Sequence, residues 1–269
     1  MLLIVKLGGS ILKTGASSEL FADLKEIMKS NKIIFVHGGG SDVTDIASKL
    51  GKEQNFVISP QGFRSRYTDK ETIEIFTMVM AGKMNKKIIL ALEKQGIKSI
   101  GLSGLDGSLL KAVRKKRLII VDKRGRKKVI DGGYTGKIIE INKDLLWAIL
   151  KKNYTPVITP IAISEEYEPL NVDGDRTAAE IACNLGADKL ILITDVEGLI
   201  LNKKIISKIK TSEIDSILPE IGQGMSTKIH SSIKALNGGV KEVIITSGAG
   251  KKPLSSALNQ KRGTVIING

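Results

Sequence analysis

The chain has 269 residues, of which 42% are hydrophobic and 26% charged, as is typical of a soluble globular protein with one large domain or two fused lobes. No apolar run is long enough to span a membrane, the single cysteine excludes an internal disulfide, and two histidines argue against a zinc site. The formal net charge of +14 favours an anionic partner: a nucleotide, a nucleic acid, an anionic membrane or an acidic protein. The first residues do not resemble a secretory leader, so we expect a cytoplasmic protein.

The first predicted element is a strand that ends in a glycine turn. Leu2–Val5 are four apolar, partly β-branched residues, the pattern of a strand buried on both faces. Beyond Lys6, the backbone N–H groups of Gly8-Gly9-Ser10 can point at one anion, and the lysine adds a positive charge. We expect a phosphate group here. An ordinary strand-to-helix turn with a surface lysine is the alternative, because short glycine loops are common.

Strands and helices alternate along most of the chain. Strands are predicted at 32–36, 99–102, 155–160, 189–193, 241–245 and 264–267, and helices at 19–30, 42–50, 70–80, 84–95, 174–185 and 226–237. The alternation predicts an α/β fold in which a mainly parallel, open sheet is covered by helices on both faces, a three-layer αβα sandwich.

Ligands of such sheets bind at the carboxyl ends of the strands, where this chain carries further turns of the same kind. The segment His37-Gly38-Gly39-Gly40 follows one strand, Gly101–Gly104 ends another, and Thr194-Asp195-Val196-Glu197-Gly198 follows a third. Four such turns at corresponding positions favour an enzyme that handles phosphate groups. Neither a Walker A sequence nor a protein-kinase glycine loop is present.

Three polar segments add charged groups to these turns. Arg64 and Arg66 precede a helix and suit bidentate binding of a carboxylate; an Arg–Asp pair at the helix start is the alternative. The segment Asn171–Thr177 precedes another helix, where Asn171 can donate to a substrate carboxylate and Asp175 can hold lysines, or the carboxylates can simply cap the helix. Lys228 stands near the start of the helix predicted at 226–237.

Residues from about 108 to 140 depart from the α/β alternation. Short β-type runs at 118–121 and 128–130 alternate with turn signals, so we expect an antiparallel, basic hairpin insertion. A solvated lysine-rich face and a nucleic-acid site are the alternatives, although Tyr134 is the only aromatic residue nearby for base stacking. The candidate contacts to an acidic protein are Arg114, Lys115, Lys116, Arg117, Arg126, Lys127 and Lys128.

Five segments together resemble the amino-acid kinase family, in that family's order and over nearly the whole chain. The acetylglutamate kinase branch is the most similar, and within it the kinases that act on glutamate or α-aminoadipate attached to LysW-type amino-group carrier proteins in arginine and lysine synthesis. The segments are Lys6-Leu7-Gly8-Gly9-Ser10, His37-Gly38-Gly39-Gly40, Arg66-Tyr67-Thr68-Asp69 with Gly82-Lys83-Met84-Asn85-Lys86, Asn171-Val172-Asp173-Gly174-Asp175, and Gly224-Met225-Ser226-Thr227-Lys228.

The resemblance implies an N-terminal lobe (1–170) that binds the acyl acceptor and dimerises, and a C-terminal lobe (171–269) that binds ATP. It implies transfer of the γ-phosphoryl group to a side-chain carboxylate, with Mg²⁺ bound through the nucleotide. Lys6 and Lys228 would neutralise the phosphoryl group and Asp175 would orient both. Gly9 and Gly39 would hold phosphoryl oxygens, Gly38, Gly39, Arg66 and Asn171 the acceptor, and Thr194, Asp195, Val196, Gly198, Gly224 and Met225 the nucleotide.

One position departs from the family pattern. The branch has glycine two positions before the arginine aligned with Arg66, whereas this chain has Arg64 there and glycine at Gly62. Which arginine holds the acceptor carboxylate therefore stays open. Three other functions also stay open: phosphorylation of free N-acetylglutamate, of an isoprenoid monophosphate, and non-catalytic nucleic-acid binding. We expect the carrier-linked reaction, because a small free substrate needs no basic arm.

Overall fold

The computed structural model describes residues 1–9, 11 and 18–269, and its core is one eight-stranded sheet. The strand order is β16-β18-β17-β13-β1-β2-β10-β5, and all neighbours are parallel except β17 and β18. The predicted mainly parallel α/β fold is therefore confirmed. The strands of this sheet are β1 (Leu2–Leu7), β2 (Lys32–His37), β5 (Ser99–Ser103), β10 (Thr155–Thr159), β13 (Lys189–Thr194), β16 (Lys208–Lys210), β17 (Glu242–Ser247) and β18 (Thr264–Ile267).

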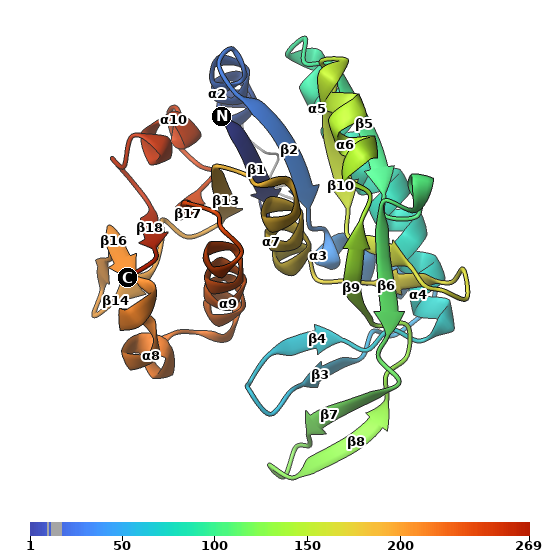
Figure 1. Cartoon of the computed structure of the whole chain (residues 1–269). Coiled ribbons are helices and arrows are strands. Elements are labelled where there is room, and N and C mark those ends of the chain that lie inside the picture. Colours follow the sequence, from blue (N-terminus) through green and yellow to red (C-terminus); the bar gives the residue numbers. More distant parts are fainter. Residues whose placement is uncertain (10, 12–17) are drawn as a thin grey trace.

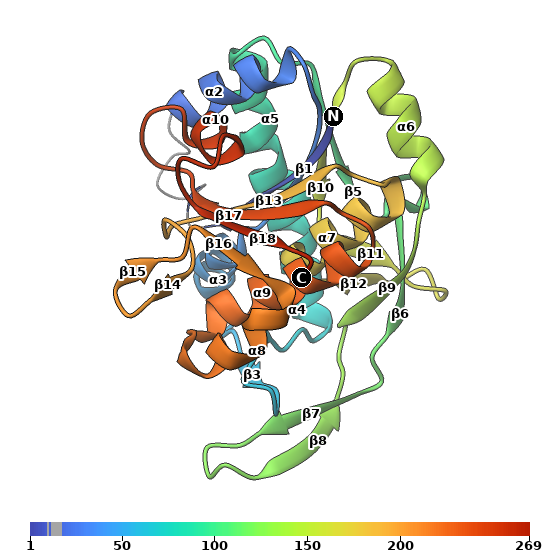
Figure 2. The ribbon, with the colours of Figure 1, turned by 60° about the vertical axis from the view of Figure 1, so that its left-hand side comes forward.

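Helices cover both faces of the sheet, as the predicted three-layer sandwich requires (Figure 1 and Figure 2). One face packs against α2 (Ser18–Met28), α3 (Gly40–Lys49), α4 (Lys70–Thr77), α5 (Asn85–Lys94) and α10 (Pro253–Leu258). The other face packs against α6 (Lys143–Lys151), α7 (Gly174–Leu185), α8 (Ile214–Ile217) and α9 (Gln223–Asn237). No helix in the described part of the chain is long and apolar enough to cross a membrane.

Strand β1 lies in the middle of the sheet, and its side chains alternate between the two faces. Leu3 and Val5 enter the core beneath α2 and α5, whereas Leu2 and Ile4 enter the core beneath α7 and α9. Lys6 has the same parity as Ile4, so its side chain points toward α7. Because side chains alternate along a strand, Lys6, the only charged residue of β1, faces α7.

The helices predicted at 70–80 and 84–95 are one continuous helical stretch. A π-helical segment, η1 (Met78–Met84), joins α4 to α5. Met80 and Met84 of this segment are buried and lie against Gly39, where an added Cβ would come within 2.8 Å of the Met80 sulfur. The π-helical turn therefore supports the glycine turn that follows β2.

A four-stranded sheet and three hairpins complete the fold. The sheet has the order β12-β11-β6-β9, and its strands are β6 (Leu110–Arg114), β9 (Gly136–Ile141), β11 (Ile161–Ile163) and β12 (Pro169–Asn171). The hairpin of β7 (Arg117–Val121) and β8 (Lys127–Asp131) projects away from the body beside the hairpin of β3 (Phe56–Ile58) and β4 (Arg64–Arg66) (Figure 1). The smallest elements are β14 (Ile200–Leu201), β15 (Lys204–Ile205), η2 (Asp106–Ser108), η3 (Thr211–Glu213) and η4 (Leu218–Glu220).

Replacing Met84 by alanine should lower the free energy of unfolding by about 2–5 kcal/mol, because the side chain is fully buried and leaves a cavity under the glycine turn. Met78 lies in the same helical segment and is 61% exposed, so Met78→Ala should change stability by no more than about 0.5 kcal/mol. Urea denaturation of both variants checks the difference. Equal losses would contradict the described packing.

Candidate active site

Two lysines from distant parts of the chain bind one carboxylate near the middle of the sheet. Lys6 Nζ lies 2.7 Å from Asp175 Oδ1, and Lys228 Nζ lies 3.0 Å from Asp175 Oδ2. All three side chains are largely buried. One carboxylate against two ammonium groups leaves this cluster with a formal charge of +1.

Three elements bring these groups together. Lys6 points from β1 toward α7, Asp175 lies in the first turn of α7, and Lys228 lies on α9, which packs against α7. Asp173 caps α7 by accepting a hydrogen bond from the Arg176 N–H at 2.9 Å. Capping by Asp173 leaves the Asp175 side chain free to bind the two lysines. The capping alternative therefore describes Asp173 but not Asp175.

The electrostatics of the cluster keep Asp175 and Lys6 charged. Burial alone would raise the pKa of Asp175, but Lys6 and Lys228 outweigh it and lower this pKa from 3.8 to about 2. Burial would also lower the pKa of Lys6, yet Asp175, Asp173 and Asp195 together raise it. The pKa of Asp173 is raised by desolvation and by the charge of Asp175, although the residue still reaches the surface.

Two glycine turns approach each other beside this cluster. The Gly8 N–H donates to Ile193 O and the Gly38 N–H donates to Leu7 O, both at 2.9 Å. A Cβ on Gly9 would lie 2.9 Å from Gly39 N, which is closer than any side chain allows. Glycine is therefore required at Gly9 by backbone contact with the second turn. Ser10, the third residue predicted in the first turn, lies outside the described residues.

His37 supports the second turn from behind. Its Nδ1 lies 3.0 Å from Gly38 O, which can only accept, so Nδ1 carries the proton and Nε2 accepts from Thr159 Oγ1 at 2.9 Å. Burial lowers the pKa of His37 to about 4, which leaves the ring neutral at pH 7. A neutral, hydrogen-bonded ring fits the predicted supporting role rather than proton transfer.

The two predicted arginines have different surroundings. Arg66 is half-buried and donates to Gly40 O at 2.7 Å, to Thr44 Oγ1 at 2.9 Å and to Gln54 Oε1. Arg64 is exposed, with its guanidinium carbon 3.7 Å from the centroid of the Phe56 ring. Burial, and next the Arg64 charge, lower the pKa of Arg66 to about 10, so it stays protonated at pH 7. Arg66 is the arginine that lies beside the glycine turn.

Two hydrogen bonds link Asn171 to the backbone of β4. Its Nδ2 donates to Thr68 Oγ1 at 3.0 Å, and Thr68 Oγ1 donates to Arg66 O at 3.2 Å. The structure therefore joins Asn171 and Arg66, two of the predicted acceptor-binding residues, through one threonine.

The residues predicted to bind the nucleotide lie at two places. Thr194, Asp195, Val196 and Gly198 follow β13 at its carboxyl end, and Asp195 is close enough to Lys6 to raise the pKa of that lysine. Gly224 and Met225 lie in the first turn of α9, one turn before Lys228. Both places belong to the C-terminal part of the chain, and Asp195 is the residue among them that acts on the lysine cluster.

The predicted carrier-binding residues differ in their exposure and in their ion pairs. Arg114 donates to Gly133 O at 2.7 Å and pairs with Glu168, and Arg126 pairs with Asp122. Lys115 is half-buried, and its pKa is lowered by burial and by Arg176. Lys116, Arg117, Lys127 and Lys128 are exposed, and none of them forms an ion pair with the acidic residues that the structure describes.

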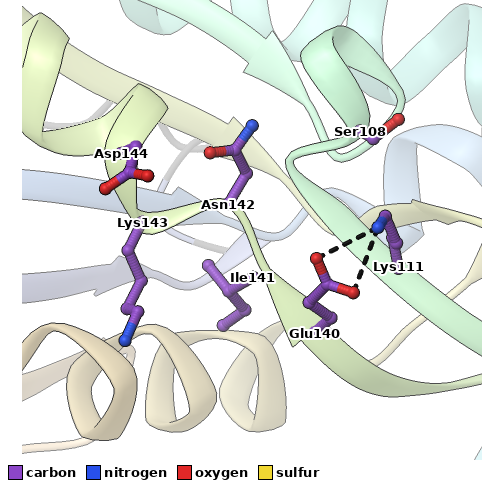
Figure 3. Close-up of a pocket in the computed structure, with 7 residues that line it drawn as sticks. All are labelled: Ser108, Lys111, Glu140, Ile141, Asn142, Lys143 and Asp144. Carbon is purple, nitrogen blue, oxygen red and sulfur yellow. Dashed lines mark hydrogen bonds and ion pairs between the residues drawn. The ribbon is translucent and has the colours of Figure 1, made fainter.

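Two open cavities lie elsewhere and contain none of the predicted site residues. The first, of about 400 Å³, lies where β9 meets α6, and Figure 3 shows Lys111 bound to Glu140 at its wall. The second, of about 580 Å³, lies between the ends of α2 and α6. Within the described residues, no group of three or more His, Cys, Asp or Glu side chains could hold a metal ion.

The site thus offers two lysines and two glycine turns around one point, with an unpaired arginine on one side and the ends of β13 and α9 on the other. Such an arrangement binds and neutralises phosphate groups. Its described residues include no general base, and a carboxylate acceptor, which is already ionised at pH 7, needs none.

Comparisons with known proteins agree with a site that binds phosphate groups. Residues 1–247 match the model of the amino acid kinase family. A protein of Nitrosopumilus maritimus named putative LysW-aminoadipate/LysW-glutamate kinase is 50% identical over 265 residues, which cover 98% of this chain and 99% of that protein. The LysW-aminoadipate/LysW-glutamate kinase of Sulfolobus acidocaldarius is 45% identical over 266 residues, which cover 98% of this chain and 100% of that protein. The fold is similar to that of N-acetylglutamate synthase from Neisseria gonorrhoeae, with a TM-score of 0.82 at 22% identity over 100% of this chain and 59% of that one.

Replacing Asp175 by asparagine should remove stability that the wild type has at pH 7 and loses in acid. Because the folded pKa is below the unfolded value, this contribution of about 2 kcal/mol is present above pH 4 and is lost as the pH falls toward 2. The stabilities of Asp175→Asn and wild type should therefore converge in that range, which urea denaturation at several pH values checks. Asp144→Asn, at an exposed carboxylate without an ion pair to other described residues, is the control. A constant difference at all pH values would contradict the ion-pair account.

Proposed function

The chain belongs to the amino acid kinase family, and we propose that it transfers the γ-phosphoryl group of ATP to the side-chain carboxylate of α-aminoadipate or glutamate held on a small acidic carrier protein of the LysW type. The product is an acyl phosphate, an intermediate for lysine or arginine synthesis. The observation that carries the proposal is the pair of lysines held by Asp175 beside two converging glycine turns.

Catalysis in this proposal rests on positioning and charge. Lys6 and Lys228 approach the transferring group from opposite ends of Asp175 and neutralise negative charge that develops on its oxygens. The N–H groups of Gly9 and Gly39 supply backbone donors, because those of Gly8 and Gly38 are already bonded to backbone carbonyls. Asp175 orients the lysines and, with a low pKa, does not remove their protons. No residue has to take a proton from the acceptor, because the acceptor is a carboxylate.

The nucleotide side lies in the C-terminal lobe, which we propose to be residues 171–269. Thr194–Gly198 and the start of α9 provide a polar edge for ATP. Mg²⁺ prefers phosphate oxygens and water and is often bound with few protein ligands. We therefore propose that Mg²⁺ arrives with the nucleotide and neutralises phosphate charge there.

The acceptor side lies in the N-terminal lobe, residues 1–170. An amino acid joined to a carrier through its amino group keeps a free α-carboxylate. Arg66 suits this carboxylate better than Arg64, because it is partly desolvated and lies beside the glycine turn that meets the phosphoryl group. Asn171, linked to the same strand through Thr68, supplies an amide next to it.

The exposed lysines and arginines of the β7–β8 hairpin provide the surface for the carrier. Their charge favours an acidic protein and speeds its encounter. The relatives' names favour a carrier-linked acceptor over free N-acetylglutamate. Family likeness leads us to propose a homodimer through the N-terminal lobe and a cytoplasmic location.

A direct assay decides between the acceptors. The purified protein with ATP and Mg²⁺ should give a hydroxamate from carrier-linked aminoadipate or glutamate when hydroxylamine traps the acyl phosphate. Free N-acetylglutamate should react with a much lower kcat/KM. Efficient turnover of the free molecule with no gain from the carrier would overturn the carrier-linked proposal in favour of an acetylglutamate kinase.

Charge reversal on the hairpin should affect only the carrier. The double variant Lys127→Glu/Lys128→Glu should raise KM for the carrier-linked acceptor by about tenfold at low salt, because rim charges act on encounter, and should leave KM for ATP unchanged. Lys151→Glu/Lys152→Glu, at two exposed lysines at the end of α6, is the matched control. Equal effects of both pairs would show that net charge, not the hairpin, matters.

A further inference from the structure

We infer that Gln54 is a positioning residue: it holds the Arg66 guanidinium through a neutral acceptor and so keeps the arginine's charge available for a carboxylate of the substrate. The inference rests on the proposed function, since it assigns to Gln54 the preparation of Arg66 for the acceptor. Gln54 lies in the segment between α3 and β3, outside every motif of the sequence.

Three hydrogen bonds hold Arg66, and all three acceptors are uncharged. They are the carbonyl of Gly40, the hydroxyl of Thr44 and the side-chain amide oxygen of Gln54. Arginine only donates, so the Gln54 atom that faces Nη1 must be Oε1. No acidic residue of the described chain forms an ion pair with Arg66, and the charge that acts on it most is the like charge of Arg64.

Three other arginines of the chain are held by carboxylates instead. Arg114 pairs with Glu168, Arg126 with Asp122 and Arg262 with Glu197. Each of these pairs offsets the charge of its arginine. Arg66 is more enclosed than a surface arginine and still has no carboxylate, so it retains a full positive charge in a partly desolvated place.

Two acidic residues at the start of α4 form ion pairs with Lys52, which lies in the same segment between α3 and β3 as Gln54. Lys52 Nζ lies 2.8 Å from both Asp69 Oδ2 and Glu71 Oε2. The Tyr67 N–H, next to Arg66, donates to Asn55 O at 2.8 Å. The segment that carries Gln54 is thus tied to β4 and α4, which sets the amide oxygen against Arg66.

Stability alone does not account for glutamine at this position. The Nε2 of Gln54 is buried, and none of the described residues accepts a hydrogen bond from it. An unpaired buried N–H group costs free energy. Glutamate has the same length, lacks that N–H group and would form a charge-assisted bond with Arg66. Glutamine therefore gives a weaker hold than glutamate would, and what it preserves is the charge of Arg66.

The test compares variants of equal length. Gln54→Glu should keep or raise the melting temperature, and should raise KM for the carrier-linked acceptor by about tenfold, because Arg66 is already neutralised. KM for ATP and kcat should stay near the wild-type values. Gln54→Met, which removes the hydrogen bond to Arg66 but adds no charge, should raise the acceptor KM less than Gln54→Glu does. Gln61→Glu, at an exposed glutamine of the β3–β4 turn, makes the same charge change away from Arg66 and should leave KM unaltered.

The outcomes separate this inference from the function on which it rests. If wild-type protein gives no hydroxamate with the carrier-linked acceptor, the proposed function fails and the inference with it. If wild type is active and Gln54→Glu has the wild-type acceptor KM, or the same KM as Gln54→Met, the role of a neutral acceptor at Gln54 is overturned while the function stands. A fall in both kcat and melting temperature for Gln54→Glu would also overturn it, because that pattern marks a structural residue.

Discussion

Two buried lysines bind the same carboxylate, and the geometry of the site depends on this three-residue cluster. Lys6 belongs to the central strand, Asp175 to the first turn of α7 and Lys228 to α9, so the cluster ties one strand and two helices together. Burying charges is costly unless they are paired, and pairing one carboxylate with two ammonium groups leaves an excess positive charge. An incoming phosphate group completes the cancellation of charge. The cluster is therefore stable enough to form and still attractive to an anion.

Arg66 also carries positive charge that the described residues around it do not cancel. Around Asp175 the excess charge comes from two cations sharing one anion, whereas around Arg66 it comes from acceptors that are all neutral. Between these two positive groups lie glycine turns that approach each other through backbone contacts alone. A molecule with a carboxylate at one end and a reacting carboxylate at the other would meet fixed positive charge at both ends. The acceptor would then be oriented before the phosphoryl group is transferred.

Sequence patterns predicted the parts of this fold that depend on local periodicity. The strand predicted at Leu2–Val5, the helix predicted at 174–185 and the glycine turns between them follow from apolar runs and from glycine, whose signals are local. The polar segment itself suggested that Asp175 holds lysines, but only the family resemblance named Lys6 and Lys228, since 169 and 53 positions separate them from Asp175. The β3–β4 hairpin was missed because it alternates few apolar residues, and the π-helical turn was missed because its signal is a change of one residue in hydrogen bonding. Gln54 could not be found at all, because glutamine in a loop has no local signal and gains its role from Arg66.

In the proposed reaction, recognition of the acceptor is shared between parts of the chain that the phosphoryl transfer itself does not need. Glutamate and aminoadipate differ by one methylene, which a pocket distinguishes by only about 1–3 kcal/mol, so a larger surface is the more effective means of selection. The surface that we propose is the β7–β8 hairpin, which contacts β3, whose partner β4 ends at Arg66. A two-stranded hairpin alone is marginally stable in water, so its position depends on this contact. In the proposed reaction, the surface that receives the carrier and the arginine that receives its amino acid are therefore neighbouring parts of one packed unit, and docking of the carrier delivers the acceptor directly to Arg66.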